Sequence, residues 1–183
     1  MAGIKLIKKR RKSALTNYKR RITLLKSGLD RVVVRKSNRS VTVQVAKFDQ
    51  KGDIILATAH SSELKQMGWE PRANVPTAYL TGYLLAQKTK QLGLKECILD
   101  IGLYKPIKSS IAFSAAKGCT DNGMKILGSF EVDQSRLNGT HISTYAKSAA
   151  QDPKQFSSYK KSNFDLSKMN EVFEEVKKKI ASK

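Results

Sequence analysis

The chain has 183 residues and a mass of 20.4 kDa, and its 35 Lys and Arg residues outnumber 15 Asp and Glu residues, for a formal net charge of +20. A hydrophobic content of 40% can build a core, so the composition excludes wholesale disorder and allows one domain with extensions. No run of 18 apolar residues and no secretory signal is present, which predicts a soluble intracellular protein. The basic pI of about 10.1 predicts a polyanionic partner, and it leaves nucleic acid and an anionic membrane surface both open.

The charge is concentrated at the N-terminus, where residues 1–40 hold 14 basic residues and one acid. Self-repulsion predicts an arm that is open in isolation and becomes ordered when RNA phosphates supply the countercharge. A nuclear-localisation tract or a solubilising tail is the alternative. Tyr18 favours a contact surface, because an aromatic ring can stack on an unpaired base. The candidate RNA-binding residues of the arm are Lys5, Lys8, Lys9, Arg10, Arg11, Lys12, Tyr18, Lys19, Arg20 and Arg21.

Three β-strands follow the arm. A β-branched run at residues 31–36 and a Val-rich alternation at 41–46 are separated by a turn, and a second turn precedes an apolar run at 53–58. Short turns between successive strands predict a three-stranded antiparallel meander.

The next segments predict a crossover. Ser61 can cap a short helix that Gly68 ends, and Pro76 fits the first turn of a long apolar helix that runs to about Leu92. A short apolar strand at 96–101 then completes a strand–helix–strand unit, which requires a parallel strand pair. The predicted fold class is therefore α/β.

The rest of the chain has helical and linker patterns. Helices are predicted at about 111–122 and 141–149, and the Pro- and Ser-containing stretch 151–163 predicts a linker. An apolar stripe predicts a C-terminal helix, capped by Asp165 or Ser167, that docks on the body or on a partner. The stripe consists of Met169, Val172, Phe173, Val176 and Ile180. The predicted organisation is a basic arm (1–30), a globular domain (31–150), and a linker with an amphipathic helix (151–183).

Catalytic and metal-binding patterns are weak. The loop 102–109 ends in Lys-Ser but lacks the second Gly of a phosphate-binding loop, and two histidines favour structural roles. Cys97 and Cys119 have neither disulfide-framework nor zinc spacing and are expected to be reduced. We expect no enzyme activity, metal or cofactor. A metal-dependent RNA-processing enzyme that uses Asp49, Asp53 or Asp100 remains the rival hypothesis.

Two further basic groups extend the candidate RNA surface beyond the arm. The first strand and its turn contribute Arg31, Arg35, Lys36, Asn38 and Arg39. The loop after the 96–101 strand contributes Tyr104, Lys105 and Lys108. Arg guanidinium groups suit bidentate phosphate contacts, and Asn can reach base edges or a 2′-hydroxyl. A charge-protected edge strand and an ordinary surface loop are the corresponding alternatives.

Four ordered motifs carry a family resemblance. These are the segments 31–39 (RVVVRKSNR), 74–82 (NVPTAYLTG), 99–103 (LDIGL) and 139–146 (GTHISTYA). Together they resemble the signatures of the large-subunit ribosomal protein family that binds 5S ribosomal RNA, over about residues 8–147. The length is similar to that of the archaeal branch.

The resemblance implies a mixed sheet flanked by helices, of the ribonuclease-H-like type found in some translation components, with a basic arm on 5S rRNA. It also implies attachment of 5S rRNA in the central protuberance of the cytoplasmic large subunit, and contacts with the large rRNA and neighbouring ribosomal proteins. The segment around His141 is then a secondary RNA contact. Nuclease activity is not expected, because the first strand offers Arg31 and Val residues where a metal-binding carboxylate is needed. A peripheral membrane protein is disfavoured, since the arm lacks a large apolar face.

Overall fold

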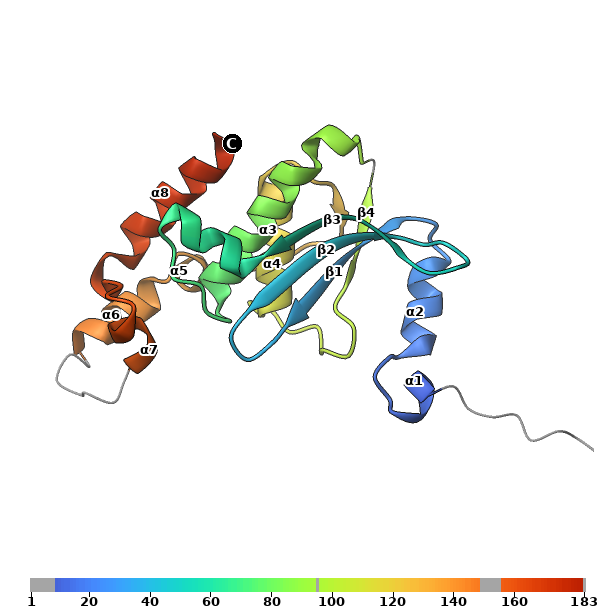
Figure 1. Ribbon diagram of the computed structural model, residues 1–183, viewed down its shortest axis with the longest axis horizontal. Coiled ribbons are helices and arrows are strands. Elements are labelled where there is room, and N and C mark those ends of the chain that lie inside the picture. Colours follow the sequence, from blue (N-terminus) through green and yellow to red (C-terminus); the bar gives the residue numbers. More distant parts are fainter. Residues whose placement is uncertain (1–8, 95, 149–155, 183) are drawn as a thin grey trace, which may run out of the picture.

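A five-stranded mixed sheet forms the centre of the computed structural model, which describes residues 9–94, 96–148 and 156–182. The strands are β1 (Asp30–Lys36), β2 (Val41–Lys47), β3 (Ile54–His60), β4 (Cys97–Asp100) and β5 (Ile126–Leu127). Their order is β3-β2-β1-β4-β5 (Figure 1). The pairs β1–β2 and β2–β3 are antiparallel, whereas β4 pairs in parallel with both β1 and β5. The predicted meander and the predicted parallel pair are thus confirmed.

The helices lie between and after the strands. The α-helices are α1 (Lys9–Lys12), α2 (Tyr18–Leu25), α3 (Val75–Thr89), α4 (Ile111–Asp121), α5 (Gln134–Leu137), α6 (Thr140–Ser148), α7 (Ser157–Lys161) and α8 (Met169–Ala181). The 3₁₀ helices are η1 (Ser61–Met67), η2 (Lys90–Leu92) and η3 (Leu166–Lys168). The predicted helices of the globular domain correspond to η1, α3 with η2, α4 and α6. His60, rather than Ser61, caps η1 by accepting a hydrogen bond from the Ser62 amide.

One face of the sheet is covered by α3 and α4 (Figure 1). Val41, Val43 and Val45 of β2 are fully buried, as expected for alternate residues that point toward a helical layer. The two helices approach closely at Gly82 of α3, where a Cβ atom would clash with the carbonyl group of Ala115 in α4. This contact explains why an apolar helix of this length carries a glycine in its interior.

The C-terminal helix packs on the body, which confirms the docking predicted from its apolar stripe. Phe173 of α8 is buried against Trp69, with the ring centroids 6.1 Å apart, and against Tyr79 of α3, at 5.5 Å. Lys177 Nζ lies 5.6 Å from the centroid of the Tyr79 ring, a cation–π contact. Helix α8 therefore belongs to the same core as the sheet and α3.

Two segments differ from the sequence prediction. Part of the expected linker is helical: α7 lies within it, and Tyr159 is buried with its hydroxyl group accepting a hydrogen bond from Asn74 Nδ2 at 2.9 Å. Residues 151–155 of that linker lie outside the described residues. Within the arm, residues 9–12 and 18–25 are helical. For α7 and α2, contacts with residues distant in sequence hold the segment on the body.

Candidate nucleic-acid interface

Helix α2 presents basic side chains at the surface, and none of its residues is buried. Asn17 begins it as an N-cap, with Oδ1 accepting a hydrogen bond from the Arg20 amide at 3.0 Å. Tyr18 is half-buried. The exposed lysines of α1 and α2 are Lys9, Lys12 and Lys19. The candidate residues Lys5 and Lys8 lie outside the described residues, as do the side chains of Arg10 and Arg11.

Two arginines attach α2 to the globular domain. Arg20 Nη1 donates hydrogen bonds to the carbonyl oxygens of Gly102, at 2.7 Å, and Tyr104, at 3.1 Å. Arg21 Nη2 donates to both carboxylate oxygens of Asp53, at 2.8 and 2.9 Å. Charge-assisted hydrogen bonds of this length are among the stronger polar contacts in proteins. The second half of the predicted arm is therefore part of the folded surface.

Arg31 is not a surface residue, which corrects the prediction that it contacts RNA. Its relative exposure is 1%. Its Nη1 donates to Asp100 Oδ2 at 2.8 Å and its Nη2 to Asp53 Oδ2 at 2.6 Å. A buried cation needs compensating carboxylates, and here two of them occupy the guanidinium group. Arg31 therefore stabilises the fold and is not available to a phosphate.

Asp53 links the buried and exposed arginines. Burial opposes ionisation of its carboxyl group, but the hydrogen bonds and charges of Arg31 and Arg21 outweigh burial and hold the pKa of Asp53 below its usual value. Asp53 therefore stays ionised at neutral pH and connects β1, α2 and the start of β3.

The acidic residues of the rival nuclease hypothesis do not form a metal site. Asp53 and Asp100 are bridged by Arg31, and Asp49 accepts a hydrogen bond from the Lys51 amide in a turn. Across residues 9–94, 96–148 and 156–182, no group of three His, Cys, Asp or Glu residues is placed to hold a metal ion. A cation already occupies the place between the two carboxylates.

The end of β1 and the loop after β4 lie together beside α2. Tyr104 Oη donates to the Lys36 carbonyl oxygen at 2.9 Å. A Cβ atom at Gly102, whose φ is +61°, would lie 2.9 Å from Arg35 Nη1, so glycine allows the arginine to pass close to the loop. Lys105 is exposed in the same loop. We define the basic surface as the following residues of these three neighbouring segments: Tyr18, Lys19, Arg20, Arg35, Lys36, Tyr104 and Lys105.

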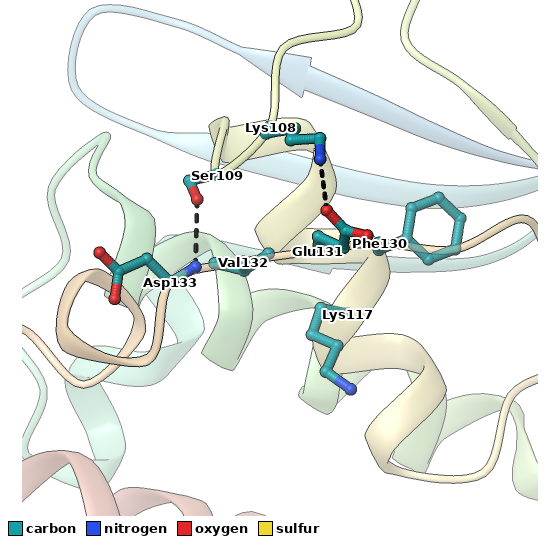
Figure 2. Close-up of a pocket in the computed structure, with 7 residues that line it drawn as sticks. All are labelled: Lys108, Ser109, Lys117, Phe130, Glu131, Val132 and Asp133. Atoms are coloured by element: carbon teal, nitrogen blue, oxygen red, sulfur yellow. Dashed lines mark hydrogen bonds and ion pairs between the residues drawn. The ribbon is translucent and has the colours of Figure 1, made fainter.

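Lys108 is not part of the basic surface. It lies beside a cavity of about 530 Å³ that is also lined by Lys117, Glu131 and Asp133 (Figure 2). Lys108 Nζ and Glu131 Oε2 are 2.6 Å apart, and this contact raises the pKa of Lys108 and lowers that of Glu131. Because charges of both signs line the cavity, it has no strong preference for a polyanion.

His141 and the β1–β2 turn also lie apart from α2. His141 belongs to α6, at the opposite end of the molecule from α1 and α2 (Figure 1), and its Nδ1 donates to the Ser135 carbonyl oxygen at 3.1 Å. Asn38 and Arg39 are exposed in the turn between β1 and β2. The sequence-predicted residues are thus distributed over more than one surface.

Two basic residues that the sequence prediction did not include surround Arg39. Arg72 and Lys161 line a cavity of about 320 Å³ together with Arg39. Arg72 stands alone in a polar loop, and Lys161 lies in the segment predicted to be a linker. No local pattern identifies either residue, although the adjacent pair Lys160–Lys161 is a weak signal of a basic site.

Comparisons with known proteins give a consistent result. Residues 4–96 match a family described as ribosomal large subunit proteins 60S L5 and 50S L18. The chain is 42% identical over 180 residues to the large ribosomal subunit protein uL18 of Thermofilum pendens, covering 94% of this chain and 92% of the relative. It is 41% identical to uL18 of Methanococcus maripaludis over 179 residues, covering 94% of this chain and 93% of that relative. It is also 41% identical to uL18 of Sulfurisphaera tokodaii over 182 residues, with coverages of 95% and 93%.

The fold is that of a basic α/β protein, with Lys and Arg side chains exposed on α2, at the end of β1 and in the loop after β4. The matches make the class specific: the chain belongs to the uL18 family and is a structural protein of the large ribosomal subunit, not an enzyme. This confirms the family resemblance carried by the four motifs. Within the described residues, no helix has the length and apolar character needed to cross a membrane.

Proposed function

We propose that the chain binds 5S rRNA through its arm and the basic surface, and that it helps attach this RNA to the large subunit in the central protuberance. We also propose contacts with the large-subunit rRNA and with neighbouring ribosomal proteins. The observation that carries the proposal is the attachment of α2 by Arg20 to the loop that holds Tyr104 and Lys105. Because Tyr104 of this loop also donates a hydrogen bond to the Lys36 carbonyl oxygen, three basic segments that are far apart in the sequence are held side by side.

The proposed mechanism is electrostatic and shape-based. Lys19, Arg35, Lys36 and Lys105 neutralise phosphates, and their spacing on a folded surface selects an RNA of matching shape. Tyr104, which is 44% exposed, offers a ring for an unpaired base. Two of the predicted contacts, Arg20 and Arg21, act mainly by positioning α2. The basic residues before α2 add affinity through counterion release.

The fold itself fits the proposed family role. A mixed sheet with three antiparallel strands, a parallel partner beside β1, and helices on one face supports the ribonuclease-H-like type. The first strand has Arg31 paired with two carboxylates, so a cation of the protein holds the position where nuclease chemistry needs metal ligands. This arrangement supports RNA binding without cleavage.

An equilibrium titration tests the proposal. The full chain is titrated against 5S rRNA and an unrelated structured RNA of equal length at several salt concentrations. We expect a preference for 5S rRNA that persists at high salt, because a preformed surface reads shape. Equal affinities that fall together as salt rises would refute a 5S-specific surface.

A matched pair of variants locates the interaction. In K19Q/R35Q/K36Q, the slope of log K against log salt for 5S rRNA should fall by about 2–3, since each phosphate contact contributes about 0.7–0.9. The control K65Q/K90Q/K125Q removes three exposed lysines outside the basic surface and should change the slope much less. Equal effects of the two variants would contradict the assignment.

A truncation separates the arm from the docked helix. Deleting residues 1–12 removes the cations before α2 but keeps the Asn17 cap, Arg20 and Arg21. We expect weaker RNA binding and a flatter salt slope, with an unchanged free energy of unfolding, because Lys9 and Lys12 of α1 are exposed. A truncated chain that unfolds would show that the first helix contributes to the fold.

A further inference from the structure

A second basic site lies where three segments distant in the sequence meet. Arg39 comes from the β1–β2 turn, Arg72 from the loop before α3, and Lys161 from the end of α7. They surround a cavity of about 320 Å³ whose remaining lining residues are Ser158 and Ser162. No acidic residue of the described chain lines this cavity, in contrast to the larger cavity beside Lys108. The site is therefore suited to an anion.

Arg72 is held in place by contacts within the chain. Its Nη2 donates to the Ser158 carbonyl oxygen at 2.9 Å and contacts Glu70 Oε1 at 3.0 Å. Its guanidinium carbon lies 5.4 Å from the centroid of the Tyr159 ring, and the Tyr159 hydroxyl accepts a hydrogen bond from Asn74. The Nε atom of Arg72 is buried and has no hydrogen-bond partner within the described chain. A fixed planar group of this kind loses little entropy when it binds an oxyanion.

The other two cations lack countercharges. Neither Arg39 nor Lys161 forms an ion pair with any described residue. The backbone of Arg39 is ordered by the turn, where Ser37 Oγ accepts hydrogen bonds from the Arg39 amide at 3.3 Å and the Ser40 amide at 2.9 Å. Glu70 balances only one of the three positive charges. A bound phosphate would remove the repulsion that remains.

The site lies on the α7 side of the molecule, away from α2. In Figure 1, α7 lies with α6 and α8 at one end and α1 and α2 lie at the other end, whereas Arg39 is in the β1–β2 turn, three residues after Lys36 of the basic surface. A protein that attaches one RNA to another needs a separate surface for each. Since the arm and the basic surface are assigned to 5S rRNA, the cavity at α7 is available to the second RNA.

We propose that Arg39, Arg72 and Lys161 bind a backbone phosphate of the large-subunit rRNA, so that the chain bridges two RNA molecules. This inference rests on the proposed function. The cavity supplies the phosphate with two guanidinium groups, which suit bidentate contacts, and with an ammonium group. The chemistry would also accept free inorganic phosphate, and the experiment separates the two sources.

The test uses the full chain with Arg39 and Lys161 replaced in R39Q/K161Q, which leaves the packed Arg72 intact. The control is K65Q/K125Q, with the same loss of charge at exposed positions outside both basic sites. Binding to protein-free large-subunit rRNA and to 5S rRNA is measured at several salt concentrations. We expect R39Q/K161Q to lower the salt slope on large-subunit rRNA by about 0.7–0.9 more than the control, and to match the control on 5S rRNA.

Three outcomes would overturn the proposal. The first is a salt slope of R39Q/K161Q on large-subunit rRNA equal to that of the control. The second is a reduced salt slope that R39Q/K161Q shows on 5S rRNA only. The third is a shift of the Arg72 Nε resonance when inorganic phosphate alone is added, without any loss of slope, which would identify a site for free anions. The K19Q/R35Q/K36Q variant tests 5S rRNA binding by the basic surface separately, because those residues do not line the cavity.

Discussion

Replacing Arg31 by Met should strongly destabilise the chain. The Arg31 side chain is 2% exposed and holds two carboxylates, Asp53 at 2.6 Å and Asp100 at 2.8 Å. In R31M, Asp53 keeps Arg21 as a partner, whereas Asp100 retains only its hydrogen bond from the Gly102 amide. The substitution preserves most of the volume and therefore isolates the loss of charge.

The expected cost is about 3–5 kcal/mol, the range for removing one member of a buried ion pair and leaving the other charge uncompensated. A domain of this size is typically stable by about 5–15 kcal/mol, so this loss is a large fraction of the total. The control is K88M, which breaks the Lys88–Glu63 pair at 2.6 Å. Both of those side chains are more than one-third exposed, and the expected cost is about 0–1 kcal/mol.

Urea denaturation of the full chain at pH 7 without RNA measures both free energies of unfolding. The double variant R31M/D100N removes the orphaned carboxylate and should recover at least half of the loss. A cost for R31M below about 1 kcal/mol would refute the reasoning, since it would place this network in the same class as surface pairs.

Three further outcomes test the core and its titratable groups. The pKa of Asp53 is lowered, so its stabilising contribution is present above its ordinary value of about 3.8 and is lost as the pH falls through the folded-state pKa. D53N should therefore show a shallower loss of stability below about pH 4 in acid titrations followed by circular dichroism. Cys97 and Cys119 are buried, and burial raises both thiol pKa values, that of Cys97 to about 11. Neither thiol should react with a thiol reagent at pH 8 until the chain is unfolded, and rapid reaction of the native protein would contradict this placement. G82A should lower the free energy of unfolding by about 1–3 kcal/mol because its Cβ meets the Ala115 carbonyl group, and a neutral effect would show that α3 and α4 can separate there.

The sheet and the main helices follow from local patterns. Alternation at Val41, Val43 and Val45 identifies a strand with one covered face, and that face is the one that packs on α3 and α4. The apolar stripe of α8 likewise identifies its buried side, with Phe173 at its centre. Patterns of this kind are reliable because burial of one face imposes a period on neighbouring residues.

The errors concern residues whose environment depends on distant partners. Arg31 and Arg35 point to the same side of β1, and nothing local distinguishes them. Their environments differ because Asp53 and Asp100, which are 22 and 69 positions along the chain from Arg31, surround only Arg31. Tyr159 likewise lies in a Ser- and Lys-rich segment typical of a linker, yet it is buried because Arg72 and Asn74 contact it.

The sequence by itself determined the sign and concentration of the charge, the α/β class, and the family to which the motifs point. Those properties depend on composition and on short-range order, which the chain carries in any conformation. Only the tertiary structure decided which cations remain available to RNA: Arg31 is neutralised inside the fold, Arg20 positions α2, and Arg39 meets Arg72 and Lys161 at a separate cavity. The physical reason is that the availability of a charge depends on its nearest countercharge and on its exposure to solvent, and folding sets both through residues far away in the chain.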